Sequence, residues 1–286
     1  MDWLIDPFSF DFMQRALAAG VLAVLTTSLV GTWVILRGLA FMGDALAHGV
    51  LPGIAVALLL GVHPMLGAAV AAVVMVGAIS LVHRTTRLTE DTAIGLLFVG
   101  MLALGVIVIS RSGSFAVDLV AILFGDVLGT SWGDLVVQGV AAVIAVGGVV
   151  LFYRPLLVLS FNEQKAATLG LRPRLAHLLM MGLITVAVVA SFQTVGALLV
   201  FGLLIAPPAT AVLVARRVPI VMVFASVLGT VEVAAGLLIS FHFDTAAGAT
   251  MSGLAVAVFF VVLAGVRLRA AWVGRRADAP AGDTLG

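Results

Sequence analysis

The sequence predicts an all-α protein, a polytopic bundle of transmembrane helices. Two observations predict this class. Hydrophobic residues make up 63% of the 286 residues and charged residues only 10%, whereas soluble domains carry about 25% charged residues. The charged residues are also clustered, and the apolar stretches between them are roughly 17–23 residues long, which is the length of a helix that crosses a hydrocarbon layer of about 30 Å.

Apolar runs between charged or turn-rich breaks divide the chain into about nine predicted spans. Only the polar step Ser191–Thr194 separates the sixth from the seventh, so eight spans is the main alternative. The ends are defined to within several residues. The nine spans lie at about 16–36, 39–61, 64–82, 92–110, 133–153, 177–193, 195–215, 220–241 and 248–266.

The basic residues predict which loops are cytoplasmic. With nine spans the loops alternate between two sides, and all 15 lysine and arginine residues except Arg15 and Arg111 fall on one side. Because short cytoplasmic loops are enriched in Lys and Arg, we expect that side to be inside. This places the N-terminus outside and the C-terminus inside. No basic residue precedes Arg15, so we expect no cleavable signal peptide.

We expect one transmembrane domain, residues 1–270, followed by a disordered cytoplasmic tail, residues 271–286. The tail is rich in Ala, Gly, Asp and Pro, a composition that does not bury enough apolar surface to fold. The outside connection 110–132 contains the apolar stretch FAVDLVAILFGDVL, which is too short to span a membrane. It predicts a re-entrant or interfacial helix.

The inside connection, SFNEQKAATLGLRP, predicts a short surface helix at about 162–171. Asn162 is a suitable N-cap, Gly170 lies where the helix would stop, and Pro173 follows.

Three ionisable residues fall at depth inside the predicted spans: Asp44, His48 and Glu232. Ionisable groups are costly in hydrocarbon, so each is a candidate functional residue. Asp44 and His48 are four residues apart and therefore share a helical face. If the second span begins near Leu39, His48 lies about 13 Å deep, close to the bilayer midplane.

Pro52 adds a third feature to this stretch. Proline has no N–H, so the carbonyl of His48 is expected to lose its helical partner. A carboxylate, an imidazole and a free carbonyl together suit a divalent cation such as manganese, iron or zinc. The alternative is that Asp44 and His48 pair with each other, or with a neighbouring helix, for packing alone.

Other polar and proline positions leave two interpretations each. Glu232, also near mid-depth, either completes a metal site or is a protonated hydrogen-bond donor between helices. Pro207 and Pro208 are expected to break the seventh span, either where it lines a cavity or where neighbouring helices pack on it. His242 and Asp244, near the outer end of the eighth span, either form a metal site at the outer mouth or are simply solvated.

Several catalytic and binding classes are excluded by what the sequence lacks. It has no Gly-rich loop ending in Gly-Lys-Ser/Thr, and its single lysine, Lys165, lies in no such context, so the chain does not bind ATP by that mechanism. Cysteine is absent, which removes thiolate ligands, and Asp44 has no second intramembrane aspartate for a proteolytic dyad. The net charge of +1 gives no reason to expect nucleic acid. We expect a transport protein without catalytic residues or a permanently bound cofactor.

Five segments resemble, in order and spacing, the landmarks of one family: the permease subunits of manganese, zinc and iron ABC importers. The resemblance covers nearly the whole chain except the tail. The openings PFSFDFMQRAL and VILRGLAFMGDALAH look closest to the manganese-type members. The five segments are FMGDALAHGVLPGIAVALLLG (41–61), EDTAIGLLFVGMLALG (90–105), DLVAILFGDVLG (118–129), AATLGL (166–171) and VGALLVFGLLIAPPATA (195–211).

The resemblance implies a homodimer in a bacterial cell membrane, two cytoplasmic ATPase subunits and an extracytoplasmic metal-binding protein. It implies that Asp44 and His48 contact the transported metal, and it gives no role to Glu232. It also implies that the cytoplasmic helix seats in a groove of the ATPase. The coupling residues would be Asn162, Glu163, Ala166, Leu169, Gly170 and Leu171.

Three rival functions are kept open. A siderophore- or cobalamin-importing permease would have a large cavity without midplane ion ligands. A proton-coupled secondary metal transporter would use Asp44 and Glu232 as its relay, and a membrane-embedded enzyme would need a catalytic set that the sequence lacks. Oxygen and nitrogen sites for manganese, zinc and iron overlap, so the expected cargo is one of these three ions.

The predicted orientation is testable with two reporters. A fusion at the C-terminus should report a cytoplasmic location, and a tag placed before Asp2 should be reachable from outside intact cells, because the basic residues lie almost entirely on one side. Both termini on the same side would contradict nine spans and favour eight.

Overall fold

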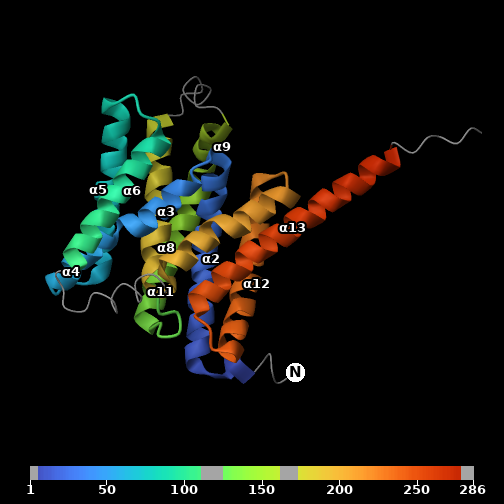
Figure 1. The fold of residues 1–286 in the computed structure, drawn as a ribbon, viewed down its shortest axis with the longest axis horizontal. Helices are drawn as coiled ribbons and strands as arrows, with labels where there is room; N and C mark the ends of the chain where they lie inside the picture. The colour runs from blue at the N-terminus through green and yellow to red at the C-terminus, as the bar shows by residue number, and fades with distance from the viewer. Residues whose placement is uncertain (1–5, 111–124, 162–172, 278–286) are drawn as a thin grey trace, which may run out of the picture.

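The computed structural model describes residues 6–110, 125–161 and 173–277 (Figure 1). In these ranges the chain forms helices and turns and no strand, which confirms the all-α fold class. The elements are η1 (Asp6–Ser9), α2 (Asp11–Arg37), α3 (Ala40–Gly49), α4 (Leu51–Leu59), α5 (Pro64–Thr85), α6 (Glu90–Ile109), α8 (Trp132–Leu151), α9 (Tyr153–Phe161), α11 (Pro173–Val214), α12 (Val218–Phe243) and α13 (Ala247–Ala277).

Within the described ranges, eight helical segments are long and apolar enough to cross a membrane. Helices α3 and α4 together make one of them, and the first part of α11, Leu175–Phe192, makes another. The seventh predicted span is present as the shorter apolar segment Leu199–Val214. All nine predicted apolar segments are therefore helical. Eight of them are long enough to span a membrane, which is the number that the eight-span alternative gives.

Helix α11 is interrupted at Gly196, where φ is 76° and ψ is 162°. The polar step expected to separate two spans, Ser191–Thr194, stays helical, and the break falls two residues beyond it. The backbone of Gly125, which also has a positive φ of 65°, lies directly against Gly196 and Val195, with no room for a Cβ on Gly125. Only glycine combines this dihedral with so close an approach of two backbones.

Pro207 and Pro208 do not break α11, contrary to the expectation from the sequence. The backbone stays helical through both prolines, and Gly196 is the described residue of α11 with non-helical dihedrals. The carbonyl of Leu204, which Pro208 leaves without a helical N–H donor, packs on Gly31 of α2 with no space for a Cβ. Helix packing, rather than a break, is therefore the role of this proline pair.

Helix α2 lies at the centre of the bundle and packs against α8, α11 and α12 (Figure 1). Small residues bring these helices close. Gly20 packs against Val233 of α12, and Gly229 of α12 packs against Val24 in return. In hydrocarbon, where lipid is as apolar as the protein, small residues that permit close contact are a main source of helix association.

Three predicted segments lie wholly or partly outside the described residues. Helix α13 runs on to Ala277 and away from the bundle (Figure 1), so helical structure continues past Ala270, where the tail was expected to begin. Residues 278–286 are outside the description. The interfacial helix expected within 110–132 falls largely on residues 111–124, and the surface helix at 162–171 falls on residues 162–172, which are also outside it.

The contact between Gly31 and the Leu204 carbonyl predicts a large effect of a small substitution. Gly31→Ala would place a methyl group on a backbone oxygen, which a rotamer change cannot relieve, so we expect a loss of about 1–3 kcal/mol in stability. Thermal unfolding of the purified protein in detergent would measure it. Gly77→Ala is the matched control, because nothing lies within 4 Å of a Cβ there. Equal melting temperatures for the two variants would contradict the packing described for α2 and α11.

Candidate functional site

Asp44 and His48 meet on one face of α3, as their spacing predicts. The Nδ1 atom of His48 lies 3.2 Å from Oδ1 of Asp44 and 3.1 Å from the Asp44 carbonyl oxygen. Both side chains stay partly open, with exposed fractions of 23% for His48 and 25% for Asp44. The two side chains are thus in contact, but a single chain leaves both of them partly exposed.

The orientation of the imidazole leaves one nitrogen directed away from Asp44. Because Nδ1 faces the carboxylate, Nε2 is on the opposite edge of the ring. A histidine held through one ring nitrogen by a carboxylate is the usual arrangement when the other nitrogen binds a metal ion. The second carboxylate oxygen of Asp44 is a further hard donor suited to divalent transition metals.

Helix α6 provides an aromatic wall for this pair. The ring of Phe98 stands edge-on to the His48 ring, with centroids 5.9 Å apart and an interplanar angle of 89°. Phe98 in turn packs edge-on against Phe41 of α3, at 5.7 Å and 70°. These contacts restrict the imidazole to one plane. Neither phenylalanine was identified from the sequence, because nothing in the spacing of α6 indicates which of its apolar residues faces α3.

The span that carries the pair is divided at Val50, near the predicted break. Helix α3 ends at Gly49 and α4 begins at Leu51, with Pro52 in its first turn. The N–H of Val50 is directed at the carbonyls of Leu46 and His48. Of these two contacts, the one with Leu46 has the geometry of a hydrogen bond, 3.3 Å long, so the free carbonyl expected at His48 stays a prediction.

Glycines fix this divided span against its neighbours. Gly49 packs on the sulfur of Met75 in α5, and Gly53 packs on the carbonyl of Gly67 in the same helix, with no room for a Cβ in either case. From α6, a Cβ on Gly105 would lie 2.9 Å from the Cβ of Leu51. Helices α5 and α6 thus hold the residues that follow His48 on two sides.

Glu232 is buried in α12, only 2% exposed, and neither of its carboxylate oxygens has a hydrogen-bond partner among the described residues. Helix α12 packs on α2, α11 and α13, whereas α3 packs chiefly on α6 and α11 and also contacts α2, α4 and α5. Among the described residues no group of three or more His, Cys, Asp or Glu side chains is close enough to hold a metal ion. The structure therefore does not bring Glu232 to Asp44 and His48 within one chain.

His242 and Asp244 lie at the end of α12, close to the start of the chain. Asp244 terminates the helix in a left-handed conformation, with φ of 51°, and is exposed. The ring of His242 packs against Phe241, 5.4 Å away, and Phe241 in turn faces Phe10. The role at the outer mouth suggested for His242 and Asp244 stays a prediction. The six predicted coupling residues fall outside the described part of the chain.

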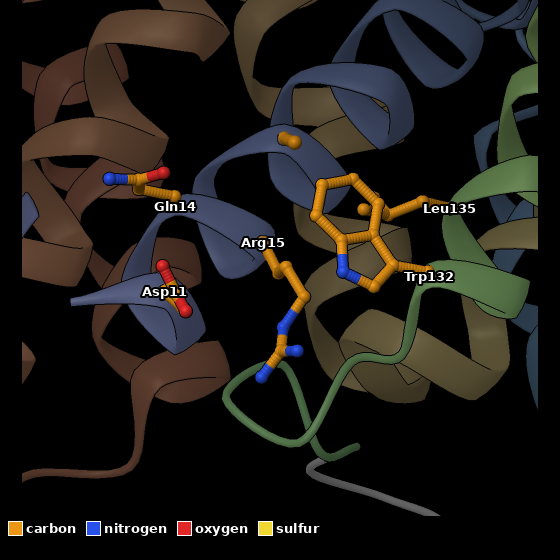
Figure 2. Close-up of a pocket in the computed structure, with 6 residues that line it drawn as sticks. Asp11, Gln14, Arg15, Trp132 and Leu135 are labelled. Atoms are coloured by element: carbon orange, nitrogen blue, oxygen red, sulfur yellow. The ribbon is translucent and has the colours of Figure 1, made fainter.

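A cavity that the sequence did not reveal lies at the same end of the bundle, where α2 and α8 begin (Figure 2). Its volume is about 340 Å³. Its lining combines charged, amide, aromatic and apolar side chains from two helices that are far apart in the sequence. These residues are Asp11, Gln14, Arg15, Ala18, Trp132 and Leu135.

The fold and the Asp44–His48 pair define a multi-pass α-helical membrane protein with ionisable side chains inside a spanning segment, which is the pattern of a transport protein. Residues 9–265 match the model of the ABC 3 transport family. The chain belongs to this family.

Several named relatives align with this chain along nearly its full length. The manganese transport system membrane protein MntC of Halalkalibacterium halodurans is 38% identical, over 94% of each chain. A probable iron transport system membrane protein of Haemophilus influenzae is 32% identical, over 94% of this chain and 98% of the relative. The solved structure of PsaBC from Streptococcus pneumoniae in complex with Fab contains a chain that superposes with a TM-score of 0.82 at 33% identity, covering 91% of this chain and 94% of that one. The chain is a multi-pass permease of the bacterial plasma membrane.

Proposed function

We propose that this chain is the membrane-spanning subunit of an ABC importer that carries divalent transition-metal ions into the cytoplasm. The observation that carries the proposal is the Asp44–His48 pair, one oxygen and one nitrogen donor on a helix inside the membrane-spanning region. Among the relatives, some are named for manganese transport and two for iron transport. Manganese is the cargo that we favour, because the manganese-named relatives share more of the sequence.

A single chain supplies too few ligands for this task. Manganese, iron and zinc ions take at least four ligands. Asp44 and His48 are only two residues, and both lie on one helix. No third His, Asp or Glu of the described ranges lies close enough to complete a site. A second copy related by a twofold axis would contribute the same pair. We therefore infer a homodimer, with the metal passing between two α3 helices whose Asp44 and His48 side chains remain partly open.

The transport step follows from these residues. Asp44 holds Nδ1 of His48 and so keeps Nε2 available as a neutral ligand, and Phe98 fixes the plane of the ring. An extracytoplasmic metal-binding protein would deliver the ion to the outer mouth. Two cytoplasmic ATPase subunits would bind and hydrolyse ATP, and the helix predicted at 162–171 would transmit their movement to this chain, which performs no covalent chemistry.

A proton-coupled transporter is disfavoured by the position of Glu232. A relay would require Asp44 and Glu232 to communicate, but they lie on two different helices, α3 and α12, each of which packs on α2 and α11, and they belong to no common group of ionisable side chains among the described residues. A permease for large chelates would need no ligand pair in the membrane, so the Asp44–His48 contact also favours a bare ion as the cargo.

The ion site can be tested by conservative substitution. Asp44→Asn removes the charge but keeps the shape, and His48→Ala removes the nitrogen donor. We expect each to lower manganese uptake by about 10–100-fold per assembled complex. Uptake of ⁵⁴Mn into proteoliposomes, normalised to the amount of complex, measures this effect.

Glu232→Gln is the matched control, since it changes a buried carboxylate outside the proposed site. It should leave uptake per complex unchanged even if the amount of complex falls. Wild-type uptake per complex in both Asp44→Asn and His48→Ala would remove the ion site. A loss in Glu232→Gln equal to theirs would restore the relay as the better mechanism.

The coupling helix can be tested separately. Gly170→Arg would place a long charged side chain where the predicted helix ends, so we expect ATP hydrolysis to continue while metal uptake is lost. Leu88→Arg, on an exposed residue of another predicted cytoplasmic loop, is the control and should affect neither. Uptake at the wild-type rate in Gly170→Arg would make residues 162–171 a simple connector.

A further inference from the structure

The cavity between the first turns of α2 and α8 has no place in the proposed metal pathway, which runs along α3. Helix α2 has 27 residues and is therefore roughly 40 Å long at about 1.5 Å per residue. This exceeds the hydrocarbon thickness of about 30 Å and approaches the full bilayer with its headgroups. The first turn of α2, which carries Asp11 and Arg15, thus falls in the headgroup layer.

Arg15, a half-buried cation of the cavity lining, forms no ion pair among the described residues. Its Nε atom is buried and makes no hydrogen bond to the described residues. Asp11 lies one turn earlier, yet the ion pair that the described ranges contain is that of Asp44 with His48. In the view of Figure 2 the guanidinium group of Arg15 lies between the side chains of Asp11 and Trp132. A buried, unpaired donor on a cation is costly, so an anionic ligand would stabilise this arrangement.

The other walls of the cavity are held in place. The amide nitrogen of Gln14 donates a hydrogen bond of 2.9 Å to the carbonyl of Phe8. Trp132 opens α8, where Ser131 and Asp134 form a capping box that fixes the start of the helix. The indole of Trp132 is nevertheless 71% exposed. Exposed tryptophan at a helix end is typical of a position at the membrane interface.

An uncovered apolar strip leads from the cavity into the membrane. It starts at Trp132 and continues along α8 through Val136, Val140 and Val143, all of them exposed in this chain. Residues at this spacing share one helical face. The strip is suited to an acyl chain that descends from a headgroup held in the cavity.

We propose that this cavity binds the headgroup of a phospholipid with a primary amine, of the phosphatidylethanolamine type. The phosphate would lie on Arg15, the ammonium group on Asp11, and one acyl chain along the strip of α8. The carboxylate of Asp11 within the same lining decides between headgroups, because it would repel a purely anionic one and attract an amine. A volume of about 340 Å³ is at the lower end of ligand pockets and suits a headgroup rather than a whole lipid.

Native mass spectrometry of the full-length protein in detergent would test this site. The probes are phosphatidylethanolamine, phosphatidylcholine and phosphatidylglycerol with identical acyl chains, titrated singly. We expect the wild type to bind phosphatidylethanolamine most tightly. Arg15→Gln should weaken that binding about tenfold, as loss of a charge-assisted hydrogen bond does, whereas Arg216→Gln, an exposed arginine at the other end of the bundle, should not.

Asp11→Asn provides a second readout on an exposed residue whose substitution does not threaten folding. It should abolish the preference for the amine headgroup while retaining binding through the phosphate, and Asp91→Asn should change nothing. Equal affinity of Arg15→Gln and Arg216→Gln would overturn the proposal, as would tighter binding of phosphatidylglycerol by the wild type. Displacement of the lipid by an equal concentration of inorganic phosphate would assign the cavity to a soluble anion instead. Protection of the site by an extracytoplasmic metal-binding protein, with no lipid bound, would assign it to protein docking.

Discussion

The absence of water in the hydrocarbon layer is the constraint on which this structure depends. Each polar group inside the bundle must find its partner within the protein or remain uncompensated. Asp44 and His48 meet each other, and the Leu204 carbonyl, deprived of its donor by Pro208, rests on Gly31. The carboxylate oxygens of Glu232, which have no partner among the residues that the structure describes, are enclosed by packing helices. Close packing of the helices at glycine residues makes these arrangements of polar groups possible.

The same constraint explains why the ligand pair can be both stable and functional. Asp44 partly compensates His48, yet each side chain keeps about a quarter of its surface open. Phe98 and the glycine contacts of Gly49 and Gly53 fix the position of the helix that carries the pair. A preorganised pair requires little rearrangement when an ion arrives, which favours rapid exchange along a transport pathway over permanent binding.

Local features of the fold were predictable, and contacts between distant segments were not. Hydrophobic length identified the helices, and the four-residue spacing of Asp44 and His48 placed them together, because both depend only on helix geometry. The position of the break in α11 was not predictable, since Gly196 adopts its conformation against Gly125, which is distant in the sequence. The break expected at Pro207 and Pro208 was wrong for the same reason, because the backbone there packs on Gly31 of α2, which is distant in the sequence. That Glu232 does not join Asp44 and His48 within one chain was not predictable either, because it depends on how the helices assemble.

The central claim is that two copies of Asp44 and His48 bind one transported ion between them. X-ray absorption at the manganese edge, recorded on the purified, Mn²⁺-loaded transporter, tests this most directly because it reports the ligands of the metal itself. The account predicts two imidazole nitrogens in a shell otherwise made of oxygen, both lost in His48→Ala. A shell of oxygen alone, or imidazole scattering that persists in His48→Ala, would contradict it.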